Sequence, residues 1–500
     1  MDLFHNLGIG FGVALQPYNL FVCFLGTLIG TLIGVLPGIG PLATMAMLLP
    51  ITLYLPPESA LIMLAGIYYG AQYGGSTTAI LVNLPGESSS AVTCIDGYQM
   101  ARNGRAGAAL AVAALGSFFA GTVGTILIAL FSPALAQVGL AFRAPDYFSL
   151  MVLGLVGAIV LAHGSVVKAV GMVFLGLLLG IVGTDVTSGA TRFTFGNLEL
   201  SDGIDFVVIA VGLFGLGEII SNLSNRGVER SAGIAKVTSL WPSKEEFRQA
   251  WPAVLRGTGI GSVLGLLPGG GALLSSFASY TVEKKLSKTP ERFGRGAIEG
   301  VAGPESANNA GAQTSFIPML TLGIPSNVIM AMMIGAMMMQ GIVPGPQVMT
   351  ERPTLAWGMI CSMWIGNLML VIINLPLIGV WIKLLSIPYR LLFPAIILFC
   401  CIGVYSVNNS TFDVMLAAAF GILGYAFIRL GCEPAPLALG FVLGPLMEEN
   451  LRRAMLLSRG DPMIFVQRPI SAVLLAVTAV LILLLVMPAF RSNRKEAFQE

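Results

Sequence analysis

The chain has 500 residues, of which 55% are hydrophobic and only 10% are charged, whereas an average soluble domain has about 25% charged residues. A soluble fold of this length cannot bury so much apolar surface, so the protein is predicted to be embedded in membrane lipid. The formal net charge of +2 gives no indication of a nucleic-acid partner, and none is expected.

Apolar segments of spanning or near-spanning length follow one another along the chain, separated by short polar breaks. Because lipid cannot satisfy backbone polar groups, these segments are expected to be helical. The sequence predicts an all-α polytopic membrane protein with about 12 transmembrane helices, preceded by a short interfacial helix within residues 1–16, which lack the features of a secretory signal. The apolar segments are 18–36, 41–55, 60–84, 107–135, 146–162, 166–184, 204–222, 256–282, 310–340, 355–385, 391–428, 434–447 and 470–490.

Cysteine and histidine are too sparse to build a metal cluster. The chain has six cysteines without a C-x-x-C pair and two histidines, so no transition-metal site and no cofactor are expected. The cysteines are predicted to be reduced packing residues. The 61 glycines lie mostly inside apolar runs, which predicts close packing of helix against helix.

An internal repeat divides the chain at a basic segment, residues 221–252. Gly-Val-Leu-Pro-Gly-Ile-Gly (34–40) matches Gly-Leu-Leu-Pro-Gly-Gly-Gly (265–271) at an offset of 231 residues, and residues 75–86 align loosely with 315–326 at an offset of 240. Two matched pairs in the same order predict a duplicated architecture. The predicted organisation is a first transmembrane repeat (1–220), a cytoplasmic linker (221–252), a second transmembrane repeat (253–490) and a cytoplasmic tail (491–500).

Each repeated motif breaks a helix at hydrophobic depth, since proline removes a backbone donor and glycine permits unusual conformations. Such breaks are tolerated only inside protein or beside a water-filled cavity, and paired breaks in two halves indicate the substrate site of a transporter. The free N–H groups after a break attract anions, and the freed carbonyl groups before it coordinate cations. The predicted substrate-binding residues are Gly38, Gly40, Ser76, Thr77, Thr78, Asn83, Gly269, Gly270, Ser326 and Asn327.

One polar string, Pro-Glu-Ser-Ala-Asn-Asn (304–309), leads into the apolar run of the second copy. Ionisable residues in a span are costly and are functional candidates by default. Glu305, Ser306, Asn308 and Asn309 are therefore predicted to couple transport to an ion, either Na⁺ or a proton. The alternative is that Glu305 caps a helix at the membrane surface.

The basic residues of the two copies are distributed unequally, which predicts opposite orientations in the membrane. The loop at residues 51–59 has no Lys or Arg, whereas its counterpart has Lys284, Lys285, Lys288, Arg292 and Arg295. Loops rich in these residues face the cytoplasm, so the copies form inverted repeats. With both flanking segments cytoplasmic, residues 256–282 form a re-entrant hairpin with its tip at 268–270. By inversion, residues 18–55 are predicted to form a hairpin from the periplasmic side, with longer arms.

Several strings resemble the large membrane subunit of the tripartite tricarboxylate transporter family over essentially the whole chain. They are Gly-Val-Leu-Pro-Gly-Ile-Gly-Pro (34–41), Tyr-Tyr-Gly-Ala-Gln-Tyr-Gly-Gly-Ser-Thr-Thr-Ala-Ile-Leu (68–81), Asp-Gly-Tyr (96–98), Leu-Pro-Gly-Gly-Gly (267–271), Glu-Lys-Lys-Leu-Ser-Lys (283–288), Pro-Glu-Ser-Ala-Asn-Asn (304–309) and Leu-Gly-Ile-Pro-Ser-Asn (322–327). The resemblance implies a multi-pass bacterial inner-membrane importer, driven by an ion gradient, that works with a small membrane subunit and a periplasmic solute-binding protein. Its cargo would be a small organic carboxylate such as citrate, another tricarboxylate, a dicarboxylate or an aromatic acid.

Two other functions are alternatives to a carrier. An ion channel would share the membrane fold but would not need a binding protein. A membrane-embedded hydrolase would use Ser76 as nucleophile, which requires a base within hydrogen-bond reach, and the sequence offers only His5 and His163. No Walker-type phosphate loop is present, so we expect a secondary carrier and no enzymatic activity.

Overall fold

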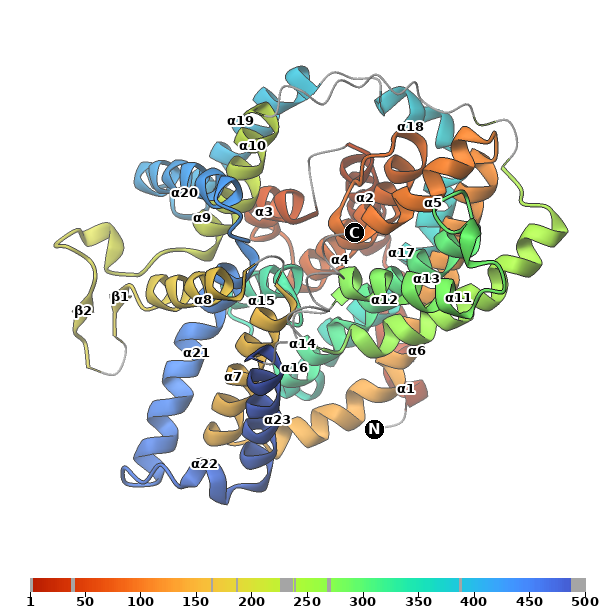
Figure 1. Cartoon of the computed structure of the whole chain (residues 1–500). Helices are drawn as coiled ribbons and strands as arrows, with labels where there is room; N and C mark the ends of the chain where they lie inside the picture. The colour runs from red at the N-terminus through yellow and green to blue at the C-terminus, as the bar shows by residue number, and fades with distance from the viewer. Residues whose placement is uncertain are drawn as a thin grey trace.

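The computed structural model describes residues 3–36, 41–162, 165–185, 188–224, 237, 240–267, 271–385 and 389–486. Helices dominate the described chain, and one two-stranded antiparallel hairpin projects from it (Figure 1). The elements up to residue 224 are α1 (Leu3–Ala14), α2 (Pro17–Val35), α3 (Pro41–Thr52), α4 (Pro57–Val82), η1 (Ser88–Ser90), α5 (Ala91–Arg102), α6 (Ala106–Leu140), α7 (Ala144–Leu161), α8 (Val166–Gly180), β1 (Gly183–Thr184), β2 (Thr191–Arg192), η2 (Leu198–Leu200), α9 (Phe206–Ala210), the π-helical turn η3 (Val211–Leu216) and α10 (Gly217–Ser224).

The second half continues the helical architecture. Its elements are α11 (Lys244–Leu264), α12 (Gly271–Leu286), η4 (Pro290–Arg292), α13 (Glu299–Thr314), α14 (Phe316–Leu322), α15 (Val328–Met339), α16 (Pro346–Glu351), α17 (Pro353–Asn374), α18 (Ile378–Leu385), α19 (Tyr389–Asn408), α20 (Thr411–Arg429), α21 (Ala435–Leu457), α22 (Ile464–Gln467) and α23 (Pro469–Val486). In Figure 1, α11–α13 lie to the right and α7 with α21–α23 to the lower left, and α4, α14 and α15 lie between them.

Five helical segments among the described residues are long and apolar enough to cross a membrane. They are Pro17–Val35, Ala106–Leu140, Phe206–Ser224, Pro353–Asn374 and Thr411–Arg429, and seven other apolar helices are shorter. A membrane protein built from helices is thereby confirmed in outline, and the count of about 12 spans stays a prediction.

Two helix pairs pack through glycines at matched positions. A Cβ at Gly26, Gly30 or Gly34 of α2 would lie 2.3–2.5 Å from backbone oxygens of α4, and a Cβ at Gly257, Gly261 or Gly265 of α11 would lie 2.1–2.4 Å from backbone oxygens of α13. The glycines are 231 residues apart, and the facing residues are 240 apart: Met63 and Gly303, Ile67 and Ala307, and Ala71 and Gly311. Only glycine permits this backbone approach. The two halves therefore use the same contact at the offsets that the sequence motifs indicate.

The helices also end alike at the second motif of each half. Asn83 ends α4 with a φ of 58°, and Gly323 ends α14 with a φ of 71°. Both residues are in the left-handed conformation that terminates a helix, again 240 positions apart. A new helical segment starts a few residues later, η1 in the first half and α15 in the second.

A further group of helices is tied together by glycine contacts and by one buried ion pair. A Cβ at Gly176 of α8 would lie 2.1 Å from the backbone oxygen of Leu437 in α21. Asp146 at the start of α7 is fully buried and accepts hydrogen bonds from Arg468, with a shortest distance of 2.5 Å. These contacts join α7, α8, α21 and α23 beside the helices that contain the breaks.

The apolar segments do not coincide one to one with helices, because hydropathy does not register local helix ends, and the longest of them were expected to be able to hold two helices. The segment 310–340 contains parts of three helices, α13, α14 and α15. The segments 355–385 and 391–428 each contain two. The hairpin β1–β2 was not predicted at all. The segment 434–447 is the start of a helix that continues to Leu457.

The N-terminal helix lies against another helix of the protein. Its Gly10 approaches α17 closely, since a Cβ there would lie 2.5 Å from the backbone oxygen of Trp357. The helix predicted within residues 1–16 is thus present at Leu3–Ala14. Its interfacial position stays a prediction.

Candidate functional site

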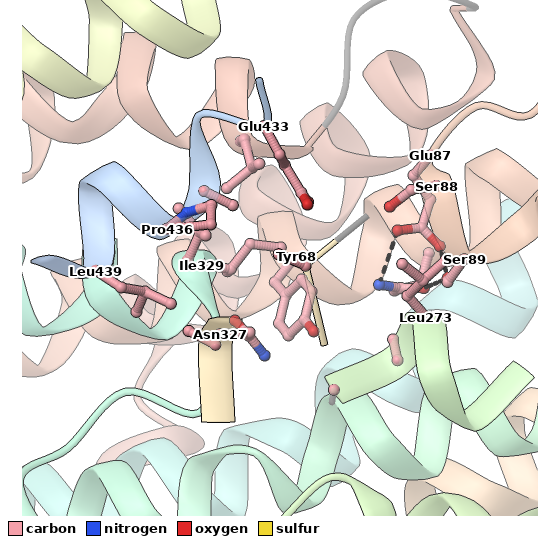
Figure 2. A pocket seen from close by; sticks show the side chains of 18 residues that line it. Tyr68, Glu87, Ser88, Ser89, Leu273, Asn327, Ile329, Glu433, Pro436 and Leu439 are labelled. Carbon is pink, nitrogen blue, oxygen red and sulfur yellow. Dashed lines mark hydrogen bonds between the residues drawn. The ribbon is translucent and has the colours of Figure 1, made fainter. Parts of the chain in front are cut away.

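One cavity lies where the breaks of both halves meet. It has a volume of about 160 Å³, which is below the ~300–1,000 Å³ of drug-sized ligand sites and suits a small solute. Figure 2 shows side chains from α4, from the segment after it, and from the starts of α12, α15 and α21 around this space. Its lining residues are Leu42, Tyr68, Gln72, Glu87, Ser88, Ser89, Ala158, Ala162, Gly271, Ala272, Leu273, Asn327, Val328, Ile329, Glu433, Ala435, Pro436 and Leu439.

The lining repeats the correspondence between the halves. Leu42 and Leu273, which are 231 positions apart, follow the two Leu-Pro-Gly segments. Glu87 and Asn327, which are 240 apart, follow the two helix ends at Asn83 and Gly323. Four chain breaks thus contribute to the same small space, although they are distant in sequence.

Glu87 was not among the predicted site residues, yet its side chain lines the cavity. It is 8% exposed, its Oε2 accepts a hydrogen bond from Gln72 Nε2 at 3.2 Å, and its Oε1 accepts one from the Ser89 hydroxyl. Gly75 makes room for it, because a Cβ there would lie 2.9 Å from the Glu87 Cγ. The sequence could have indicated Glu87 through its position, because it directly follows the Leu-Pro-Gly break at 84–86.

On the opposite half, Asn327 begins α15 and is fixed by two hydrogen bonds. Its Oδ1 accepts from the backbone N–H of Met330 at 2.9 Å, and its Nδ2 donates to Ser315 Oγ at 3.2 Å. Gly271 lies beside it with a φ of 44°. The neighbouring Ser326 is buried and donates to the Ser315 carbonyl at 3.2 Å, so it supports the break without lining the cavity.

Glu305 is fully buried in the middle of α13, which argues against a cap at the membrane surface. Its Oε2 accepts hydrogen bonds from Ser76 Oγ at 2.5 Å and Asn308 Nδ2 at 3.2 Å, and its Oε1 accepts from the Thr93 hydroxyl. The carboxyl group thus joins α4, α5 and α13 through neutral donors. Thr93 had not been predicted, because nothing local marks it.

Two of the other residues predicted for ion coupling direct their side chains away from the Glu305 carboxyl. Ser306 Oγ donates to the Ala302 carbonyl of its own helix at 2.8 Å. Asn309 Nδ2 donates to Ser117 Oγ at 2.7 Å and to the Glu305 carbonyl at 3.1 Å. The structure therefore places only Asn308 of this group on the Glu305 carboxyl.

The remaining predicted substrate residues are spread over several places. Thr77 and Ser76 line a separate hollow of about 10 Å³. Thr78 Oγ1 donates to the Val35 carbonyl at 2.8 Å, which holds α4 to α2, and Asn83 is exposed at the end of α4. Gly38, Gly40, Gly269 and Gly270 lie outside the described residues.

Three of the buried carboxyl groups are held by neutral partners alone. Asp146 and Glu283 are paired with Arg468 and Arg256. Asp96 has neutral partners but accepts three backbone N–H groups and the Tyr280 hydroxyl. Glu87 and Glu305 accept hydrogen bonds from neutral side chains, and no Lys or Arg is among the described residues that line the cavity. A buried carboxylate without a cation is costly, so these two groups are natural places for a mobile cation or a proton.

Other sites are less suited to a transported solute. A larger hollow of about 680 Å³ lies between α6, α7, α16 and α21, and of the four breaks it touches only Gly323. Among the described residues, no group of three or more His, Cys, Asp and Glu side chains could hold a metal ion. The Ser76 hydroxyl donates to Glu305, and its oxygen also lies 3.1 Å from the Gln72 carbonyl oxygen. His5 is exposed on α1, and His163 lies outside the described residues.

A family model and two bacterial proteins are similar to this chain, and two of these matches cover most of its length. The family model described as "Tripartite tricarboxylate transporter TctA family" matches residues 20–439. An uncharacterized 52.8 kDa protein in the TAR-I ttuC' 3'region of Agrobacterium vitis is 64% identical over 500 residues, which cover 100% of this chain and 99% of that protein. An uncharacterized protein in the TAR-II ttuC' 3'region of the same species is 65% identical over 240 residues, which are 48% of this chain and 99% of that protein. No solved structure gives a significant match.

Proposed function

This chain belongs to the tripartite tricarboxylate transporter TctA family, and from that premise we propose that it imports small organic carboxylates across the bacterial inner membrane, driven by a Na⁺ or proton gradient. The family is one of transporters, and the resemblance noted in the sequence is thereby confirmed. The proposed partners are a small membrane subunit and a periplasmic binding protein that delivers tricarboxylate cargo such as citrate, or a dicarboxylate.

The observation that carries this proposal is the shared cavity between the two halves. Chain breaks that face one space from two similar halves are typical of a transporter's substrate site. Asn327 and Tyr68 present neutral hydrogen-bond donors there, and in Figure 2 the Tyr68 hydroxyl points into the space. The α15 N-terminus adds the partial positive charge of a helix start, worth about 0.3–2 kcal/mol for an anion. A carboxylate would be held by such donors without a cationic side chain.

We propose Glu305 as the coupling group, with Ser76, Thr93 and Asn308 as its polar neighbours. Oxygen donors of this kind suit Na⁺, and a buried carboxyl suits a proton. Glu305 and Glu87 contact the same face of α4, because their partners Gln72 and Ser76 lie one helical turn apart on that helix. An ion there can influence the cavity through the position of α4.

The inverted arrangement is also part of the proposal. The matched glycine contacts and helix ends support a duplication, and the basic loop at 284–295 supports opposite orientations. In this arrangement the linker and the tail are cytoplasmic, and the Leu-Pro-Gly segments reach the middle of the membrane from opposite sides.

The test is uptake by vesicles that contain this protein with its small subunit and receive cargo from the binding protein. Glu305→Gln keeps the shape of the side chain and removes its charge. We expect it to reduce ion-driven accumulation about tenfold or more, in line with typical coupling between two ligands. The matched control is Glu291→Gln, which changes an exposed acid in η4 before α13 and should transport like the wild type.

The same measurements decide between the functions. Uptake that needs neither the binding protein nor an ion gradient would favour a channel. Glu305→Gln uptake at the wild-type rate with unchanged ion dependence would move the coupling role to another residue. Hydrolysis of an ester substrate that is lost in Ser76→Ala would favour the hydrolase, although Ser76 is bonded to a carboxyl group and not to a histidine.

A further inference from the structure

Glu87 and Asn327 occupy matching positions in the two halves but differ in charge. They are 240 residues apart, as are the helix ends at Asn83 and Gly323 that precede them. Both line the same cavity. Figure 2 shows them on different sides of it, with Tyr68 between them. The cavity is therefore similar in construction on its two sides and dissimilar in charge.

Glu87 is built into the cavity wall by specific contacts. Gln72 Nε2 and the Ser89 hydroxyl each donate to one of its carboxyl oxygens, and Gly75 leaves space for its side chain. Ser89 is buried, and its hydroxyl oxygen also lies 3.0 Å from Gln72 Oε1. Two side chains, one from α4 and one from η1, thus hold this carboxyl group in one orientation.

A negatively charged cargo would meet an electrostatic conflict in this space. The cavity volume of about 160 Å³ brings any bound carboxylate close to Glu87, and like charges at short range in a poorly solvated site repel strongly. Glu433 is a second acidic residue of the lining, and Tyr68 is the other titratable one. The described lining residues include no Lys or Arg to offset the charge of Glu87. A cation or a proton must therefore accompany the cargo.

The geometry points to a division of the cavity in which Glu87 holds a monovalent cation, Na⁺ or a proton, while the Asn327 side holds the cargo carboxylate. This inference rests on the proposed function and adds a second ion-dependent group to Glu305. Cation and cargo then favour each other's binding, because each reduces the unfavourable charge that the other would meet alone. Such mutual enhancement is reciprocal and is typically about 5- to 150-fold.

The test measures equilibrium binding of radiolabelled citrate and succinate to the purified membrane complex. Each is measured at low and at high Na⁺ at fixed pH, and at two pH values without Na⁺, which separates sodium from protons. For the wild type we expect affinity for the bound probe to rise about tenfold or more with the relevant cation. Glu87→Gln, which keeps the hydrogen-bonding shape, should bind the probe more tightly than the wild type at low cation and should lose most of the cation dependence.

The reciprocal variant is Asn327→Asp, which preserves the helix start because Asp caps as well as Asn does. It places a charge on the cargo side, so probe binding should weaken about tenfold or more at every cation concentration. This variant also tests the division of the cavity if the Glu87→Gln protein cannot be recovered from membranes. Unchanged probe affinity in Asn327→Asp would overturn the assignment of the cargo side.

The outcomes distinguish this inference from the function on which it rests. Wild-type complex that binds neither probe and shows no ion-dependent carboxylate uptake would overturn the proposed function, and this inference with it. Cation-dependent probe binding that is the same in Glu87→Gln and in the wild type would overturn only the role of Glu87.

Discussion

The contact between α11 and α13 offers a quantitative test of how the halves are built. A Cβ at Gly261 would lie 2.1 Å from the backbone oxygen of Ala307. Ordinary contacts of this kind are near ~3.5 Å, so the helices must separate by about 1.4 Å to admit one methyl group. The obstacle is backbone, which cannot rotate out of the way as a side chain can. Gly261→Ala is therefore expected to disturb the helix that contains Glu305.

The expected cost follows from two opposing effects. Extra atoms in a packed interior cost about 1–3 kcal/mol, and replacing glycine by alanine within a helix gains about 1 kcal/mol. Gly259 provides a matched control two residues away, because it is exposed and a Cβ there would meet nothing within 4 Å. Gly259→Ala has the same gain in helix propensity without the steric clash between helices. The free energies of unfolding of the two variants should therefore differ by about 1–3 kcal/mol.

The assay is thermal unfolding of the two purified variants in the same detergent, followed by tryptophan fluorescence. We expect a lower midpoint for Gly261→Ala than for wild type, and an equal or higher midpoint for Gly259→Ala. Equal midpoints for the two variants would refute the close backbone contact between α11 and α13.

Two other predictions concern orientation and the second group of helices. If the 284–295 loop is cytoplasmic, a cysteine at Lys288 should resist an impermeant reagent on intact spheroplasts while a cysteine at Pro57 reacts, and the opposite pattern would exclude the inverted arrangement. Asp146→Asn leaves the Arg468 charge partly buried and without its partner. We expect this variant to lose about 1–3 kcal/mol of folding stability, less than for a fully buried pair because 26% of the arginine side chain is exposed. The control Glu449→Gln removes the exposed ion pair with Arg453 and should lose about 0–1 kcal/mol of stability. Similar melting temperatures for the two variants would contradict the structural role of Asp146.

The sequence by itself determined the class of protein and the positions of its breaks. Hydropathy depends on composition alone, so the 55% hydrophobic content is sufficient to predict a helical membrane protein. Proline and glycine change the conformation of their own backbone, so the helix breaks near residues 84–86 and 323–326 could be predicted from the sequence alone. The offsets of 231 and 240 residues reappear in the contacts of Gly30 and Gly261 with their partner helices.

Only the tertiary structure decided which polar side chains meet. Glu305, Ser306 and Asn309 lie within little more than one turn of the same helix, yet only the first directs its side chain to α4 and α5. Glu87 and Asn327 line one cavity although 240 residues separate them. The direction of a side chain on a helix is set by the helix's rotation against its neighbours, and that rotation results from contacts such as Gly261 against Ala307, which join residues far apart in the chain. Local sequence contains the residues of the site, but the packing of the two halves determines which of them face each other.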